Sequence, residues 1–342
     1  MKFYCGIDLH AKDSYLCVID QKEKIHLRKK VANQLPLILH ELRPFSPKPS
    51  VVLESTLNGY WLVDGLQEAG FKVKLAHIYG LRLITGVKVK TDRRDAFSLA
   101  KLLRLDAVPE AYIYPKEKRP IRDLLRRRNR MVALRANAYI TMKTVLLQHG
   151  IYEYSRTAIK AFDEDQITKH FDHPAIQASL QLDLERIRLY TREINILEKT
   201  ILETVADEPL FELLRTIPGV GTILALTIFY ETGDIQRFDG PKQFCSYARV
   251  VPGVAQSGST TRRGRGSKQG NPHLRWAFGQ AAAIAVRYDS PVRRFRQAHL
   301  DRRRSKGRKM ISLSIVAHKL AIGAYHVLKG NVPFRQELMF SA

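Results

Sequence analysis

Phe3-Tyr4-Cys5-Gly6-Ile7-Asp8 opens the chain with an apolar run that ends in an acid, and Val51-Val52-Leu53-Glu54 repeats this pattern. Both runs are predicted to be β-strands. A third motif, Lys90-Thr91-Asp92-Arg93-Arg94-Asp95-Ala96, places two acids three residues apart at the start of a predicted helix. One face of the fold can therefore collect four carboxylates, the cluster that two Mg²⁺ ions about 4 Å apart need in order to hold a scissile phosphate.

The acids of the apolar runs are harder to explain structurally than those of the helix. An aspartate at a helix start commonly caps free backbone N–H groups, which is worth about 1 kcal/mol, so Asp92 has a purely structural alternative. Burying Asp8 or Glu54 in an apolar run is costly unless a cation compensates the charge. The sequence therefore favours a shared cation site.

Residues 1–115 are predicted to form an α/β domain around these acids. Strand patterns at 3–9, 14–20 and 24–30, separated by polar turns, indicate a three-stranded meander. Helices are then predicted at 33–43, 58–69 and 91–105, and strands at 50–55 and 71–76. We expect a mixed sheet with Asp8 on its first strand.

From residue 116 on the strand patterns disappear, and residues 116–208 are predicted to form a helical coiled-coil domain that begins with a strongly basic helix. An apolar 3-4 repeat, broken by one threonine, runs through Leu180, Leu184, Ile187, Thr191, Ile194, Leu197 and Ile201. This spacing suits an antiparallel coiled-coil hairpin or an oligomer seam, and an ordinary amphipathic core helix would also show it. Residues 151–175 are interpreted as the tip of the hairpin.

Residues 209–342 form the third predicted domain, which is mainly helical. Pro218-Gly219-Val220-Gly221 is typical of a helix-hairpin-helix turn, where Gly219 and Gly221 let backbone N–H groups approach a phosphate, although a plain helix–helix turn would look the same. The segment 251–271 is small, polar and cationic. Its basic residues and one beyond it are candidate phosphate contacts: Arg262, Arg263, Arg265, Lys268 and Arg275.

Ser257 lies in this cationic segment, directly before Gly258. A serine surrounded by arginines is a candidate phosphoryl nucleophile, because guanidinium groups offset charge that builds on the transferring phosphate. Serines in Gly-Ser-rich loops also serve turns and solubility. Ser259 stays an alternative nucleophile two residues along.

Composition points to a nucleic-acid partner. The 342 residues include 57 Lys and Arg against 33 Asp and Glu, a net charge of +24, which implies a polyanion. Neither a spanning helix nor a signal peptide is predicted, so we expect a cytoplasmic protein without membrane contact. The three cysteines have no metal-ligand spacing, and the eleven histidines, His10 included, are assigned surface or packing roles.

The motifs together resemble the DEDD transposases of the one-ten family of bacterial insertion sequences. The resemblance rests on Asp8, Glu54 and Lys90–Ala96, then on the motifs Ile217–Gly221, Phe244–Ala248, Pro252, Ser257-Gly258 and Gly270–Arg275. It covers nearly the whole chain. Two positions differ from the usual pattern: Arg249 stands in place of a glycine, and His77-Ile78 in place of Asn-Pro.

The resemblance implies a RuvC-like, ribonuclease-H-type domain, a coiled-coil domain and a C-terminal transposase domain. It implies that Asp8, Glu54, Asp92 and Asp95 bind Mg²⁺ and that Ser257 attacks a DNA phosphate to form a phosphoserine link. It further implies a structured bridge RNA that pairs with donor and target DNA. Homo-oligomers, tetramers or dimers, would pair the acids of one subunit with the serine of another.

Two other functions use the same residues. A hydrolytic junction or RNase-H-type nuclease would use the four acids with water as the nucleophile, and the segment 251–271 would only bind. A basic RNA-binding protein without enzymatic activity would need the positive charge alone. Mg²⁺ dependence and covalent attachment of the cut end distinguish the three.

Overall fold

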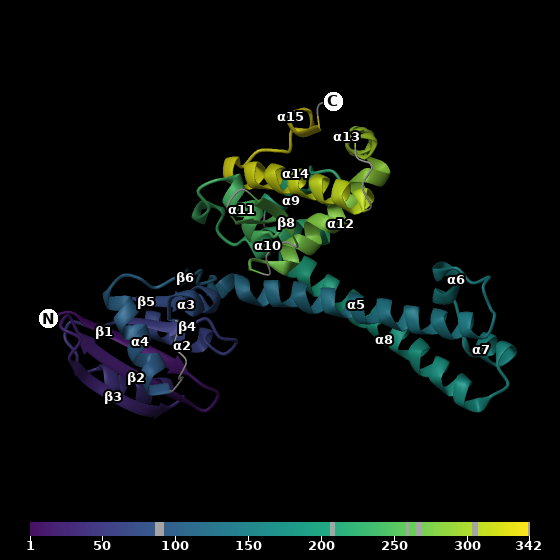
Figure 1. Cartoon of the computed structure of the whole chain (residues 1–342). Coiled ribbons are helices and arrows are strands. Elements are labelled where there is room, and N and C mark those ends of the chain that lie inside the picture. The colour runs from purple at the N-terminus through teal and green to yellow at the C-terminus, as the bar shows by residue number, and fades with distance from the viewer. Residues whose placement is uncertain (86–91, 206–208, 258–259, 265–268, 303–306, 341–342) are drawn as a thin grey trace. The chain divides into compact units, whose positions relative to one another are not determined.

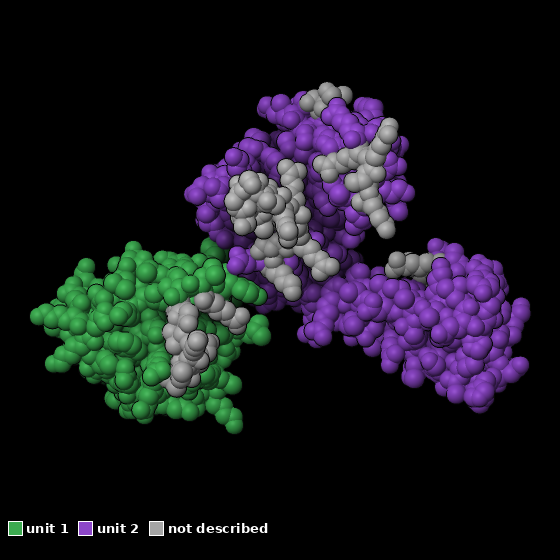
Figure 2. Space-filling model, viewed as in Figure 1, with its two compact units in different colours: residues 1–116 green, residues 117–342 purple. Residues whose placement is uncertain are grey.

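Two units, Met1–Lys116 and Glu117–Ala342, divide the chain (Figure 2). Each unit has its own hydrophobic core. The computed structural model describes residues 1–85, 92–205, 209–257, 260–264, 269–302 and 307–340, and from 253 to 264 it describes the backbone alone. The helical and C-terminal regions, which the sequence separates at residue 208, belong by their contacts to one unit.

The first unit is built on a six-stranded mixed sheet with the order β3-β2-β1-β4-β5-β6 (Figure 1). Antiparallel pairing joins β1 to β2 and β2 to β3, which confirms the predicted meander, and parallel pairing joins β1 to β4 and β4 to β5. The strands are β1 (Phe3–Leu9), β2 (Asp13–Asp20), β3 (Ile25–Ala32), β4 (Ser50–Glu54), β5 (Val73–Ala76) and β6 (Glu110–Ala111). The helices are α1 (Leu35–Leu42), α2 (Tyr60–Glu68), α3 (Ile78–Thr85) and α4 (Asp92–Arg104).

Helices cover both faces of this sheet. Alternate residues of β1 and β4, such as Ile7 and Leu53, pack with α1 and α2 in one core. The other face packs against α4 and α3. Helix α3 and the short strand β6 were not predicted from the sequence.

Gly6 allows α4 to lie directly on β1. A Cβ atom at residue 6 would be 2.0 Å from the carbonyl oxygen of Ala96 and 2.6 Å from the nitrogen of Ala100, both backbone atoms of α4. Only glycine permits this approach. The first turn of α4 is thereby held over the face of β1 that carries the even-numbered residues.

The second unit begins with a helical hairpin. Its elements are the 3-10 turn Lys116–Lys118, α5 (Arg119–Gln148), α6 (Arg156–Lys160), α7 (Glu164–His170) and α8 (Pro174–Thr204). Helices α5 and α8 pack along their length, and the 3-4 repeat of α8 is buried against α5 (Figure 1). Thr191, the polar position of the repeat, accepts a hydrogen bond from Arg135 at 3.2 Å. The repeat therefore forms an intramolecular hairpin, one of the alternatives that the sequence left open.

The tip of the hairpin has a small core of its own. Residues 151–175 contain α6 and α7. Ile159 of α6, Ile167 of α7 and Phe162 between the two helices share a core with residues of α5 and α8. Asp163 and Gln166 form a capping box at the start of α7.

The C-terminal part packs its helices around a large apolar core that also takes in the start of α5 and the end of α8. Its elements are α9 (Pro209–Arg215), α10 (Thr222–Thr232), the 3-10 turn Ile235–Arg237, α11 (Pro241–Tyr247), β7 (Gly253–Ser257), β8 (Thr260–Gly264), α12 (Pro272–Tyr288), α13 (Ser290–Asp301), α14 (Arg308–Gly330) and α15 (Gln336–Phe340). Within the described residues, α14 is the one helix long and apolar enough to cross a membrane, and 56% of its most apolar window is buried in the structure, as in a core helix.

The prediction that no strand follows residue 116 is wrong. Strands β7 and β8 form an antiparallel hairpin inside the cationic segment, with Ser257 opposite Thr260. In these two strands only Val254, Thr260 and Thr261 have high strand propensity, so the pairing is not visible in the pattern of the sequence.

Candidate active site

Two acids lie side by side on adjacent parallel strands. The register pairs Ile7 of β1 with Leu53 of β4, and the next residues along the two strands are Asp8 and Glu54. Because side chains alternate along a strand, Asp8 and Glu54 belong to the face opposite Ile7 and Leu53, which is the face that α4 covers. The sheet therefore brings together two acids that are 46 residues apart in the sequence.

The start of α4 supplies the other two acids. Asp92 and Asp95 both lie in its first turn, and the close packing of α4 on Gly6 holds that turn near the end of β1. Burial raises the pKa of Asp8, and the nearby carboxylates of Asp95 and Asp92 raise it further, while His10 opposes the rise. Asp92 and Asp95 therefore lie close enough to Asp8 to affect its charge, and among the described residues Asp8 and Asp92 belong to one group of potential metal ligands.

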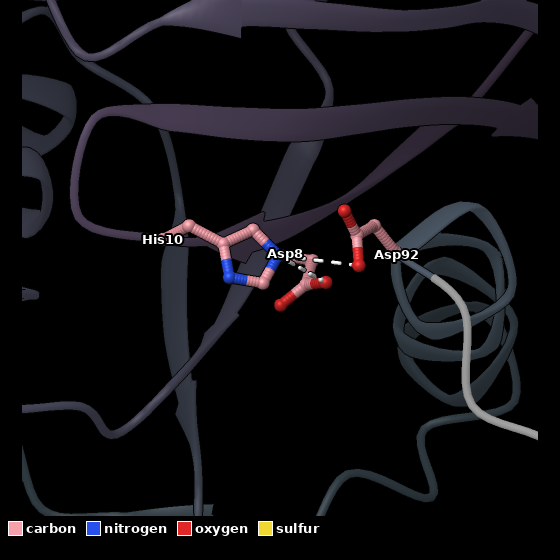
Figure 3. Close-up of side chains that lie close together, drawn as sticks. All are labelled: Asp8, His10 and Asp92. Carbon is pink, nitrogen blue, oxygen red and sulfur yellow. Dashed lines mark ion pairs between the residues drawn. The ribbon is translucent and has the colours of Figure 1, made fainter.

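The ring of His10 faces two of these acids (Figure 3). Its Nε2 atom is 3.2 Å from an oxygen of Asp8 and 3.4 Å from an oxygen of Asp92. The side chain of Asp8 is only 14% exposed, whereas those of His10 and Asp92 are about half exposed. The structure thus brings His10, which the sequence assigns to a surface or packing role, into contact with two of the predicted acids.

The donor set fits a divalent cation. Asp8, His10 and Asp92 each offer one ligand atom, and these atoms lie within 4.8 Å of one another. Ligands that are adjacent in an octahedral shell of about 2.1 Å radius lie about 3 Å apart, close to the spacing of His10 from the two oxygens. A cation would also offset the repulsion that raises the pKa of Asp8.

Ser257 is the last residue of β7 and pairs with Thr260 of β8. The same hairpin includes Arg262 and Arg263, which pair with Ala255 and Val254. Gly258, Ser259, Arg265 and Lys268 lie outside the described residues.

The C-terminal end of the segment that carries Ser257 is fixed at Tyr247. The backbone N–H of Asn271 donates to the carbonyl of Tyr247 at 2.6 Å, and a Cβ at Gly270 would meet that carbonyl at 2.4 Å. At the other end, Arg249 has a positive φ of 57°, the left-handed region that glycine prefers. This backbone conformation suits the glycine that the family pattern has at this position.

A buried ion pair lies beneath this anchor. The carboxylate of Glu231 in α10 accepts two hydrogen bonds from Arg126 of α5, at 2.6 and 2.8 Å, and one from Asn271 at 2.7 Å. The oxygen of the Asn271 side chain meanwhile caps α12 by accepting from the N–H groups of His273 and Leu274. Burial alone would raise the pKa of Glu231, but Arg126 and Asn271 hold it below its usual value. The hairpin helix α5 is thus linked to the base of the Ser257 segment.

The two glycines of the Pro-Gly-Val-Gly turn have different environments. A Cβ at Gly219 would be 2.2 Å from the carbonyl of Ala281 in α12, so this glycine serves close packing. Nothing lies within 4 Å of the corresponding position at Gly221, which is exposed at the start of α10. Phosphate contact stays a prediction, and Gly221 has the open space for it.

Two further positions that the sequence singles out, Arg275 and His77, lie at the starts of helices. Arg275 is exposed in the first turn of α12. His77, the other departure from the family pattern, lies just before α3, and its Nδ1 accepts from the N–H of Gly80 at 3.3 Å. It therefore serves as a helix cap.

Comparison with known proteins places both halves of the chain in transposase families. Residues 5–151, which contain all four acids, match the DEDD transposase model of IS110, and residues 211–297, which contain Ser257, match the Transposase IS116/IS110/IS902 family. The chain belongs to the IS110 family of transposases.

Several known proteins share moderate sequence identity with this chain. The y4qE protein of Sinorhizobium fredii is 34% identical over 201 residues, which are 58% of this chain and 48% of the relative. The transposase for insertion sequence element IS1328 of Yersinia enterocolitica is 22% identical over 82% of each chain. The pilin gene-inverting protein of Moraxella lacunata is 25% identical over 77% of this chain and 72% of its own. The aligned region thus spans about half of the first relative and most of the other two.

Sequence reasoning missed His10 and the Arg126–Glu231 pair. His10 follows Asp8 by two residues, a spacing that keeps side chains on one face while a strand continues, and this was the available signal. Glu231 ends an apolar run from Ile223. Its burial without a compensating cation would be as costly as that of Asp8, so the same argument applied to it.

Proposed function

We propose that this member of the IS110 family is a DNA transposase or recombinase that cuts and rejoins strands through a covalent phosphoserine intermediate. A Mg²⁺-binding site formed by Asp8, Glu54, Asp92 and Asp95 would assist. The observation that carries the proposal is the convergence of strand acids and helix acids at one sheet edge, in a chain of a transposase family. The order of the sheet and the placement of the acids fit a RuvC-like domain.

In the proposed reaction the Oγ atom of Ser257 attacks a DNA phosphorus, and the bond from phosphorus to the 3′-oxygen breaks. The serine hydroxyl loses one proton and the leaving 3′-oxygen takes one up, so the step is balanced. Attack by a new 3′-hydroxyl reverses the step and returns the phosphate to DNA, so no external energy source is needed. Bound Mg²⁺ would supply positive charge that stabilises the phosphate oxygens.

The acids and the arginines have separate roles in this proposal. The four carboxylates would hold the cation, and the low exposure of Asp8 keeps water from competing for its oxygens. Arg262, Arg263, Arg265, Lys268 and Arg275 would neutralise phosphates of the bound nucleic acid. Gly221 would present backbone N–H groups to a phosphate at the start of α10.

The partners proposed are donor DNA, target DNA and a structured noncoding bridge RNA. The net charge of +24 supports polyanionic partners, and it does not distinguish RNA from DNA. The RNA rests on the resemblance to guided family members. In such a system base pairing, and not the protein, would define the sequences that are joined.

A homo-oligomer, a dimer or a tetramer, is also proposed. The 3-4 repeat of α8 is already buried against α5, so it does not supply the interface. A second stripe on α8 is exposed at seven-residue spacing: Leu182 is 53% exposed, Leu189 39% and Ile196 57%. This stripe is the better candidate for contact between subunits.

The test is a denaturing-gel assay for a covalent protein–DNA adduct, with purified protein, Mg²⁺, the noncoding RNA and labelled donor and target duplexes. Ser257→Ala and Asp8→Asn are each expected to abolish the adduct. Ser259→Ala should leave it intact, which would separate the two serines. Asp20→Asn is the matched control for Asp8, because Asp20 is a buried aspartate of the same sheet that pairs with His26 at 2.8 Å.

Other outcomes identify the alternative functions. Cleavage without an adduct that survives Ser257→Ala and fails in Asp8→Asn would make the chain a hydrolytic nuclease. Nucleic-acid binding without any cleavage, unchanged in Asp8→Asn, would make it a basic RNA-binding protein. Assembling the reaction without the RNA tests the guide, since a guided enzyme should then form no adduct at a specific site.

A further inference from the structure

His10 is held in place by its backbone as well as by its ring. Its N–H donates to the carbonyl of Asp13 at 3.0 Å, which closes the turn between β1 and β2. Its carbonyl oxygen accepts from the side-chain amides of Asn33 at 2.8 Å and Asn58 at 2.9 Å. Three segments of the first unit therefore fix residue 10 at the edge where the acids meet.

The residues that hold His10 are themselves held by hydrogen bonds or by their place in the chain. The side-chain oxygen of Asn33 accepts a hydrogen bond from the hydroxyl of Ser14 at 2.5 Å, and Ser14 is fully buried in β2. Asn58 follows Glu54 by four residues, so the segment that leaves β4 also supports the turn. A ligand residue needs this kind of support, because its ring must stay oriented when no ion is bound.

The ring itself is directed at the acids (Figure 3). The Nε2 atom is 3.2 Å from Asp8 and 3.4 Å from Asp92, and the three potential ligand atoms lie within 4.8 Å of one another. Another histidine of the same sheet, His26, contacts a single carboxylate among the described residues, that of Asp20 at 2.8 Å. His10 differs from His26 because it contacts two acids from different elements.

We propose that His10 is a direct ligand of the cation at this site and that it makes the site prefer Mn²⁺ to Mg²⁺. This inference rests on the acidic metal site of the proposed function. Carboxylates alone suit Mg²⁺, whereas an imidazole nitrogen favours first-row transition metals, and Mn²⁺ accepts both in an octahedral shell. Mg²⁺ dehydrates reluctantly and keeps several waters, so it gains less from the nitrogen.

Binding of Mn²⁺ alone to the full-length chain tests the proposal without any catalytic readout. Electron paramagnetic resonance measures bound Mn²⁺ in a metal-free buffer, and pulsed spectra detect a directly bound ¹⁴N atom. We expect an imidazole ¹⁴N coupling in the native chain that disappears in His10→Ala. Affinity for Mn²⁺ should fall by about tenfold in this variant, while affinity for Mg²⁺ changes by about twofold or less.

Two further variants sharpen the result. His10→Asp restores an oxygen ligand, so it should bind both ions with a Mn²⁺/Mg²⁺ affinity ratio about tenfold lower than that of the native chain. His26→Ala is the matched control and should keep both the ¹⁴N coupling and the ratio. His10 is about half exposed, so its substitution leaves the core packing intact, and far-UV circular dichroism checks this.

Failure of this inference can be told from failure of the proposed function. Mn²⁺ binding that is lost in Asp8→Asn but shows the same ¹⁴N coupling and affinity ratio in His10→Ala would overturn the role of His10 and leave the acidic site standing. Mn²⁺ and Mg²⁺ binding that is indifferent to Asp8→Asn would overturn both.

Discussion

Replacing Arg126 with alanine should destabilise the second unit strongly, because it leaves the carboxylate of Glu231 buried without its cation. The side chain of Glu231 is 1% exposed, and Arg126 supplies two of its three hydrogen bonds. Removing one partner of a buried pair costs about 3–5 kcal/mol. Since Asn271 still donates and Arg126 itself is 37% exposed, we expect the lower end, about 3 kcal/mol.

The loss should depend on pH in a defined direction. In the native fold the pKa of Glu231 lies below its ordinary value of 4.5, so the pair stabilises fully above that value and the stabilisation is lost as pH falls through the folded pKa. Without Arg126, burial dominates and raises the pKa of Glu231. The variant can then relieve its buried charge by taking up a proton, and the difference from the native chain shrinks by about 1.4 kcal/mol per pH unit in that range.

Urea unfolding followed by circular dichroism, at about pH 7 and about pH 5, measures both effects. Arg128→Ala is the matched control: Arg128 lies two residues along α5 and pairs with Glu198, but both side chains are partly exposed, at 17% and 31%. We expect this control to lose about 1 kcal/mol at either pH. A loss for Arg126→Ala no larger than that of the control, or equal at both pH values, would refute a buried ionised Glu231.

Two further predictions concern backbone geometry. Gly219→Ala should destabilise the fold by about 3 kcal/mol, because residue 219 has a positive φ and its Cβ would overlap the backbone of Ala281. Gly221→Ala has open space and should change stability by about 0.5 kcal/mol or less. Thermal melts compare the two variants, and equal shifts in melting temperature would contradict the packing role of Gly219. Arg249→Gly should raise the free energy of unfolding by about 1 kcal/mol, because residue 249 has a φ of 57°; a decrease in urea titrations would show that contacts of the arginine side chain outweigh the strain.

The first unit was largely predictable because its signals are local. Alternating apolar residues gave β1, β2 and β4 within a residue or two, and the position of Asp8 and Glu54 at the ends of apolar runs indicated a shared edge. The register that sets them side by side, Ile7 opposite Leu53, is a pairing between distant segments and has no local signal. The same limit hid β6, a strand of two residues.

The missed features have physical reasons of their own. His10 sits in a turn, where periodicity ends, so only its nearness to Asp8 could have drawn notice. Strands β7 and β8 contain few residues of high strand propensity, and their pairing with each other has no signal in the pattern of the sequence. The exposed stripe of Leu182, Leu189 and Ile196 on α8 was missed because the buried 3-4 repeat on the same helix is longer and accounts for most of its apolar residues.

Gly6 has no functional group, yet it limits how this chain can diverge. Asp92 and Asp95 lie on α4. Helix α4 packs this closely on β1, the strand of Asp8, only because residue 6 leaves room for the backbone of Ala96 and Ala100. A side chain at position 6 would displace two acids at once. Under the proposed mechanism, loss of activity in a decaying copy of the gene can therefore begin at residue 6, while the four acids themselves are still intact.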